Sequence, residues 1–109
     1  MRKNNIVTKK KIPMGKIEIS MPEAEKALPI LHDAIERQKH LLLQSLARAE
    51  ERIRHMSAQL QVDPDRLLAG EVPHSDEQDM ALLELEGELE LRRHLREQLE
   101  ILEHLKLCP

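Results

Sequence analysis

The sequence of 109 residues predicts an all-α protein, a long antiparallel helical hairpin of the coiled-coil kind. Its first long stretch repeats apolar residues at alternating spacings of four and three, the pattern of a helix that packs along a narrow seam. A second leucine-rich stretch follows a connector that contains Pro64, Gly70 and Pro73. Phe, Tyr and Trp are absent, although sheet proteins usually rely on them.

Residues 1–19 form a basic arm for which we expect disorder or a short strand. Six basic residues and no acid fall within the first seventeen positions, whereas the remaining chain carries 11 basic and 20 acidic residues. The arm's basic residues are Arg2, Lys3, Lys9, Lys10, Lys11 and Lys16. They are possible nucleic-acid contacts, because lysine and arginine neutralise phosphates without reading sequence. The alternation over residues 16–19 is too short to decide between strand and coil.

The first long helix is expected over residues 20–61. Ser20 and Glu23 have the spacing of a capping box, and Pro22 suits the first turn. Pro29 lacks an N–H, so we expect a kink near it. The two core columns hold Leu28, Ile35, Leu42, Ala49 and Met56, and His32, Lys39, Leu46, Ile53 and Leu60. His32 and Lys39 either set the register of the seam or lie at an open, hydrated end of the helix.

Residues 62–75 are the expected connector, and residues 76–107 the second long helix. Asp63 and Pro64 predict one short helical turn that Gly70 ends. Ser75 and Gln78 predict the cap of the second helix. Gly87 within it indicates either a close helix approach or a tolerated glycine. The stripe Leu82, Leu85 and Leu89 is rotated from the stripe Leu91, Leu95, Leu99, Leu102 and Leu105, which broadens the apolar face.

A single hairpin leaves much of this leucine surface in water, so a second chain is expected to cover it. The simplest solution is a homodimer in which two hairpins form a four-helix bundle, and a partner protein's helix is the alternative. The expected interface residues are Ile35, Leu42, Leu46, Ala49, Ile53, Met56, Leu60, Leu85, Leu89, Leu95, Leu99 and Leu102.

No catalytic, cofactor or metal site is predicted, and no small-molecule substrate is expected. Three glycines form no phosphate-binding loop, and the serines show no nucleophile motif. Glu36–His40, Glu90–His94 and Glu100–His104 are spaced by four residues, whereas bundle metal sites use Glu and His spaced by three. The lone Cys108 suits a reducing cytoplasm, and no apolar run is long enough to span a membrane.

The leading interpretation is therefore a non-catalytic interaction or scaffold protein. The alternative is a small nucleic-acid-associated or antitoxin-like regulator that uses the basic arm. Residues 16–23 (Lys-Ile-Glu-Ile-Ser-Met-Pro-Glu) resemble the strand-then-helix opening of ribbon-helix-helix repressors, many of them antitoxins. That resemblance implies a strand that pairs with a second chain and enters the major groove. The chain departs from the family's pattern after Glu23, because its predicted helix continues to Gln61 rather than ending after about three turns.

Overall fold

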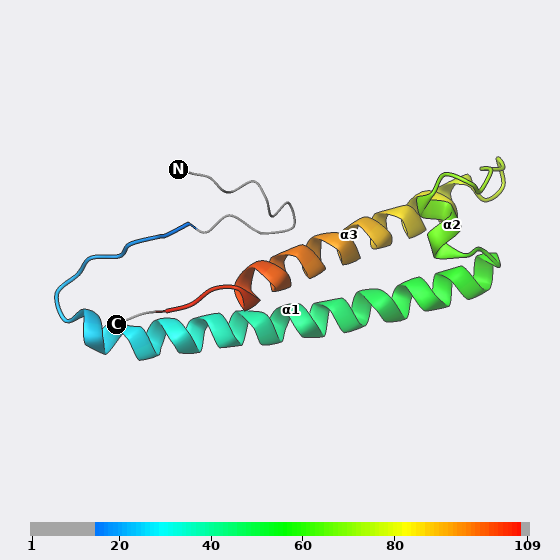
Figure 1. Cartoon of the computed structure of the whole chain (residues 1–109). Coiled ribbons are helices and arrows are strands. Elements are labelled where there is room, and N and C mark those ends of the chain that lie inside the picture. Colours follow the sequence, from blue (N-terminus) through cyan, green and yellow to red (C-terminus); the bar gives the residue numbers. More distant parts are fainter. Residues whose placement is uncertain (1–14, 108–109) are drawn as a thin grey trace, which may run out of the picture.

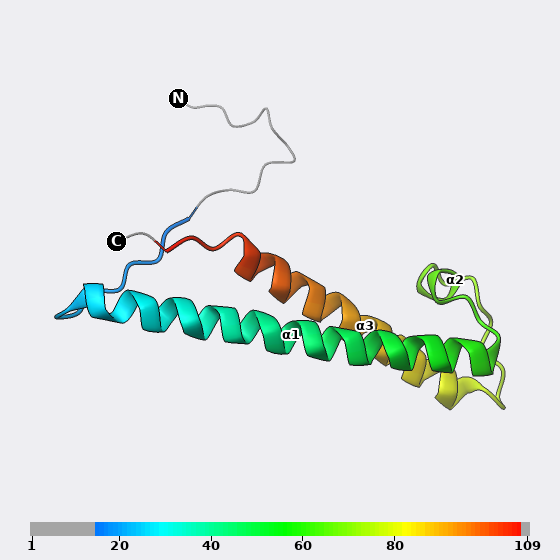
Figure 2. The ribbon, with the colours of Figure 1, turned by 90° about the horizontal axis from the view of Figure 1, so that it is seen from below.

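The computed structural model describes residues 15–107, and this part of the chain is helical without strands. Helix α1 spans Ala24–Leu60, α2 spans Pro64–Leu68 and α3 spans Asp79–Glu103. Two views show α1 and α3 running antiparallel and side by side, with α2 at the closed end (Figures 1 and 2). The molecule is extended, measuring 60 × 37 × 16 Å. The predicted all-α class with two long helices is confirmed.

Helix α1 begins at Ala24, so the predicted cap at Ser20 is wrong. Glu23 occupies the N-cap position without a side-chain cap, and its φ of 58° lies in the left-handed region. A right-handed helix cannot run through such a residue, and Pro22 and Glu23 therefore form a turn instead. Residues 15–21 lie in neither a helix nor a strand, so the chain described here has no strand over residues 16–19.

Pro29 lies inside α1 and is the sixth residue of the helix. The helix continues through it, and both views show one rod without a break (Figures 1 and 2). Only the carbonyl of Glu25 loses its helical partner at this position, since proline has no N–H. Glu25 lies in the exposed first turn of α1, where water can hydrate this carbonyl, which limits the cost.

Helices α1 and α2 end in the same way, with a residue in the left-handed region. Gln61 has a φ of 57°, and the Val62 N–H donates to the Ser57 carbonyl. Gly70 has a φ of 74°, as the sequence predicts, and follows the same hydrogen-bond pattern. The Asp63 carboxylate accepts a hydrogen bond from the Asp65 N–H at 2.9 Å, which confirms the predicted cap of α2.

Helix α3 is shorter at both ends than the predicted span of 76–107. Residues 76–78 form a turn in which the Gln78 N–H donates to the Ser75 carbonyl, so Gln78 is the N-cap and Ser75 is not. At the other end the Leu105 N–H donates to Leu102, three residues back. That tighter turn ends the helix at Glu103, and His104 is its C-cap.

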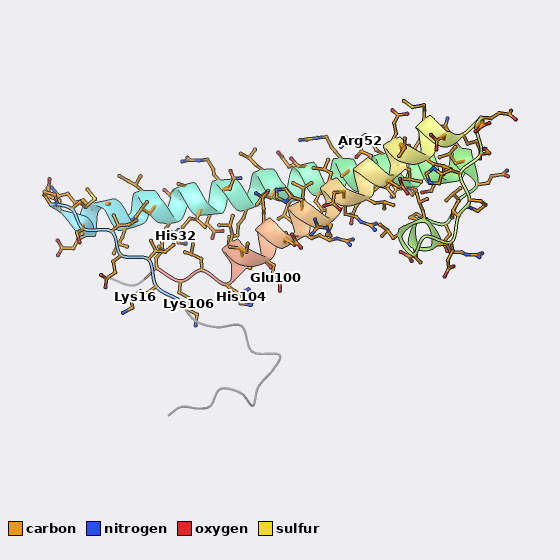
Figure 3. The ribbon with its side chains drawn as sticks, turned by 90° about the horizontal axis from the view of Figure 1, so that it is seen from above. Lys16, His32, Arg52, Glu100, His104 and Lys106 are labelled. Atoms are coloured by element: carbon orange, nitrogen blue, oxygen red, sulfur yellow. The ribbon has the colours of Figure 1, made fainter. Side chains whose placement is uncertain are left out.

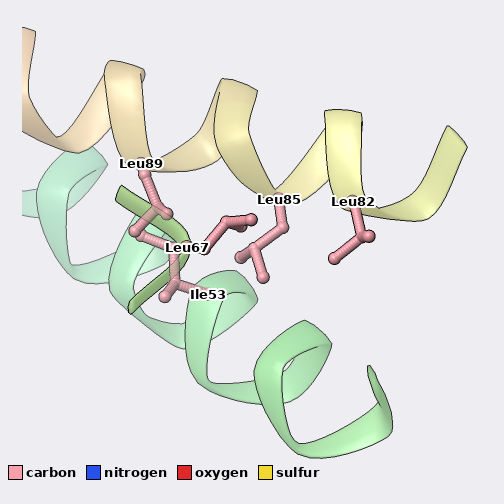
Figure 4. Packing of buried hydrophobic residues seen from close by; sticks show 5 residues of the cluster. All are labelled: Ile53, Leu67, Leu82, Leu85 and Leu89. Carbon is pink, nitrogen blue, oxygen red and sulfur yellow. The ribbon is translucent and has the colours of Figure 1, made fainter. Parts of the chain in front are cut away.

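Two apolar clusters hold the hairpin together. The first, near the connector, contains Ile53 and Leu67 with Leu82, Leu85 and Leu89, and α2 contributes to it through Leu67 (Figure 4). The second contains Leu42, Ala49 and Leu95, with Leu46, Leu99 and Leu102 packed against it. Leu82, Leu85 and Leu89 are fully buried. The core is therefore a single seam of aliphatic side chains between α1 and α3.

Candidate protein-interaction surfaces

Nearly all the predicted interface residues lie inside the hairpin itself. Eleven of the twelve belong to the two clusters or pack directly against them, and their contacts are with the other helix of the same chain. Ile35 is the exception, since it belongs to neither cluster and is half-buried. The helical periodicity thus located the seam correctly, but it did not distinguish a partner within the chain from a second chain.

The first half of α1 extends beyond α3. At about 1.5 Å per residue the 37 residues of α1 span about 55 Å, and the 25 residues of α3 span about 37 Å. Leu42 is the first residue of α1 that belongs to a cluster. We call residues 24–41 the overhang. Its apolar side chains include Ile30, which is 67% exposed, and the half-buried Leu28, Leu31 and Ile35.

The two polar residues in the overhang's core column, His32 and Lys39, differ in exposure: His32 is exposed, whereas the Lys39 side chain is largely covered. The His32 side chain is 65% exposed and lies 3.8 Å from the Asp33 carboxylate. Lys39 pairs with Glu36 at 3.0 Å. Neither residue contacts α3 through an ion pair. His32 is hydrated in the single chain, and Figure 3 shows it on the part of α1 that α3 does not reach.

Two ion pairs join α1 to α3 on either side of the seam. The Glu50 carboxylate accepts a hydrogen bond from Arg96 at 2.8 Å, and Arg52 Nε lies 3.0 Å from Glu88 Oε1. Sequence reasoning missed both pairs. The signal was present, because Glu50 and Arg52 occupy the positions that flank a heptad core, where charges select a partner helix. These charges are used within the hairpin.

His74 ties the connector to the first turns of α3. Its Nδ1 lies 2.8 Å from an Asp79 carboxylate oxygen, and its Nε2 lies 3.5 Å from Glu86. The hydrogen bond with Asp79, together with the charges of both carboxylates, raises the pKa of His74. The imidazole is thus held between two carboxylates of one helix, an arrangement that the sequence did not indicate.

Within the described helices, the Glu and His residues that are spaced by four positions do not form ion pairs with each other. His104 bonds the Glu100 backbone carbonyl rather than its carboxylate, and His40 lies next to Gln44. Glu90 pairs with Arg93 instead of His94, and this bond lowers the pKa of the Glu90 carboxyl. Within residues 15–107, no group of three or more His, Cys, Asp or Glu residues is arranged to hold a metal ion.

The basic arm lies largely outside the described residues. Arg2, Lys3, Lys9, Lys10 and Lys11 precede residue 15, and so does most of the predicted strand-or-coil arm. Lys16 is described and exposed, and Figure 3 shows it at the open end of the hairpin. The predicted contact with nucleic acid therefore rests on sequence alone.

A shallow hollow separates α2 from the outer side of α3. Leu68 and Leu89 line it together with Arg92, Arg93 and Arg96. Two of these guanidinium groups are already paired, Arg93 with Glu90 and Glu97, and Arg96 with Glu50. The hollow therefore does not concentrate positive charge for an anionic small molecule.

Comparisons with protein families, with characterised proteins and with solved structures give no match to this chain. Among the described helices, none has the length and apolar character needed to cross a membrane. Functional inference therefore starts from the surfaces of the hairpin.

Proposed function

We propose that the chain is a non-catalytic interaction protein whose overhang pairs with the overhang of a second copy. The observation that carries this proposal is the continuation of the apolar seam beyond the end of α3. Leu28, Leu31 and Ile35 lie on the same face of α1 as the buried Leu42. No residue of either cluster packs against them. These three side chains are half-buried in the single chain and form one apolar face of the overhang. Its burial in a dimer is favourable, at about 25 cal/mol for each Å².

The charge of the overhang permits pairing with itself. Between Ala24 and Lys39 the chain has three acidic and three basic residues, so two copies meet without net repulsion. A two-fold axis across the overhang sets the two copies of α1 antiparallel and presents each apolar face to an identical one. A second copy is therefore a chemically suitable cover for this surface.

Pairing through the overhang gives a dimer of different shape from the full four-helix bundle. Two helices of 37 residues that overlap by about 16 residues span about 90 Å, whereas hairpins that overlap fully remain near the 60 Å length of one molecule. We propose the longer form, because the overhang is the part of the seam that α3 leaves uncovered. X-ray scattering separates the two forms by their maximum dimension.

The test of dimerisation is the solution mass by light scattering at low and high salt. The expected result is twice the chain mass at both salt concentrations, since an apolar contact is little affected by screening. Leu31→Lys should give a monomer. Ile30→Lys is the matched control, because Ile30 is 67% exposed, points away from the face of Leu28, Leu31 and Ile35, and acquires the same charge. A monomeric wild-type chain, or equal effects of both variants, would contradict the proposal.

A second candidate function is nucleic-acid association through the basic arm. The observation that favours it is the charge asymmetry: six basic residues without an acid at the start of a chain whose remainder is acidic. The expected affinity for duplex DNA is independent of sequence and falls steeply with salt. Deletion of residues 1–16 should abolish DNA binding. The shortened chain should remain a dimer, with a solution mass lower only by the deleted residues. Salt-insensitive binding, or binding that survives deletion, would contradict this function.

A further inference from the structure

The side of α3 that faces away from the core carries a second, uncharged stripe. At 100° per residue, its members fall within an arc of about 80° around the helix. Their spacings are three, four, four, three, four and three, which is the pattern that another helix can follow. We call this set the outer stripe, and its residues are Met80, Leu83, Gly87, Leu91, His94, Gln98 and Ile101.

The outer stripe is apolar and open to solvent. Met80 is 73% exposed, Leu83 49%, Leu91 38% and Ile101 67%. The core residues of α3, among them Leu85 and Leu89, point to the other side of the helix, toward α1 and α2 (Figure 4). Leu91, which the sequence analysis grouped with the core leucines, belongs to this outer surface. The stripe is thus a separate surface from the hairpin seam.

Gly87 lies in the middle of the outer stripe, and the hairpin does not account for it. A Cβ added there would meet no atom within 4 Å, so no close helix approach within the chain requires glycine. Glycine is unfavourable inside a helix. Its one structural advantage here is that, without a side chain, it leaves the helix backbone accessible to a neighbouring molecule. A partner helix can therefore approach most closely at Gly87, with the larger residues Leu83 and Leu91 on either side.

The charge around the stripe specifies the partner. From Glu71 to Leu91 the chain contains eight acidic residues and neither Lys nor Arg. Its one basic group in this span, His74, is already held by Asp79 and Glu86. Glu84 and Glu90 flank the stripe on its two sides, and Glu90 is also paired with Arg93. A second copy crossing at Gly87 would bring identical carboxylates together, whereas a partner with Lys or Arg beside its apolar face would pair with them.

We propose that the outer stripe is the docking site for a basic amphipathic helix of another protein. This inference rests on the proposed function as an interaction protein, but it uses a different surface from the overhang. The spacing of the stripe requires a helical occupant. The chain's own basic arm contains Pro13 and Gly15 and lacks a repeating apolar stripe, so it does not supply such a helix.

Two synthetic helical peptides test the proposal against the full-length chain. Both carry the same leucine stripe, flanked by lysines in one peptide and by glutamates in the other, and fluorescence anisotropy measures their binding. The lysine peptide should bind at least about tenfold more tightly, and its affinity should fall as salt screens the carboxylates. Equal affinities of the two peptides would overturn the proposal.

Variants locate the binding site. Gly87→Leu should weaken the lysine peptide about tenfold by blocking the close approach, while the melting temperature does not fall, because leucine favours helix and meets no neighbour. Leu91→Lys should also weaken it. Leu68→Lys is the control, because Leu68 is 58% exposed, lies on α2 and receives the same charge. Unchanged binding in Gly87→Leu, or equal losses in Leu91→Lys and Leu68→Lys, would overturn the assignment.

Two further outcomes separate this proposal from the dimer. If Gly87→Leu converts a dimer into a monomer, a second copy occupies the stripe and the proposal is wrong. If the full chain with Lys9→Gln, Lys10→Gln and Lys11→Gln binds the peptide about tenfold more tightly, the arm occupies the stripe and the proposal is again wrong. Leu31→Lys should leave peptide binding unchanged, so the failure of the overhang dimer and the failure of this site are distinguishable.

Discussion

The two halves of α1 share one apolar periodicity but differ in what covers it. Over residues 42–60 the seam packs against α3, with Leu42, Ala49 and Ile53 buried. Over residues 24–41 the same columns continue, yet no residue there belongs to a buried cluster. Periodicity therefore determines which face of a helix seeks a partner, and the length of the neighbouring helix determines where that partner is found. The difference can be tested by substitutions on each side of Leu42.

The largest expected effect is a cavity in the covered half's cluster. Leu85→Ala removes a fully buried side chain and should lower the free energy of unfolding by about 3 kcal/mol. Leu31→Ala in the overhang is the comparison, and in the monomer it should cost only about 1 kcal/mol, since Leu31 is half-buried and belongs to neither buried cluster. Urea denaturation measures both. Similar losses would mean that the two halves are covered alike within one chain.

A smaller effect is expected where the covered half ends. Gln61 has a φ of 57°, a conformation that glycine adopts without strain. Gln61→Gly should therefore raise the free energy of unfolding by about 1 kcal/mol. Gln59→Gly, two residues earlier and inside the helix, should lower it by about 1 kcal/mol. Thermal denaturation compares the two, and destabilisation by both would show that the left-handed turn is absent.

The interhelical ion pairs should contribute less. A double-mutant cycle with Glu50→Gln and Arg96→Gln should give a coupling energy of about 0.5 kcal/mol, because both side chains are largely exposed. The coupling should decrease at high salt. Glu51 and Arg54 form a pair within α1 alone, and the same cycle there should be indifferent to truncations of α3. A coupling energy of zero at low salt would show that the Glu50–Arg96 pair does not help to align the two helices.

The smallest effect concerns pH and the connector. Because the pKa of His74 is raised in the folded state, its contribution to stability is complete below its ordinary pKa of 6.5 and is lost as pH rises through the raised value. Wild-type stability should therefore decline more between slightly acidic and mildly alkaline pH than that of His74→Gln. Urea midpoints across this range measure the difference. Identical pH profiles would show that the contacts with Asp79 and Glu86 are not maintained in solution.

The sequence was sufficient for the regular parts of this fold. Periodicity located both long helices and the core residues, and the Asp63–Pro64 and Gly70 signals placed α2, since each reflects a local backbone requirement. The helix starts were less predictable, because Ser20 and Ser75 had suitable capping partners but the left-handed Glu23 and the turn over residues 76–78 begin the helices later. The part of the α1 seam that stays uncovered depends on the unequal lengths of α1 and α3. Those lengths became known only from the structure.

The central claim is that a second copy covers the overhang. Amide hydrogen exchange over a wide range of protein concentration tests it directly, because it measures the two halves of α1 in one experiment. The account predicts that protection over residues 24–41 increases with protein concentration. Protection over residues 42–60 should increase only as far as dimerisation raises the global free energy of unfolding. Leu31→Lys should remove the concentration dependence. Protection over residues 24–41 that stays low and independent of concentration would contradict the claim.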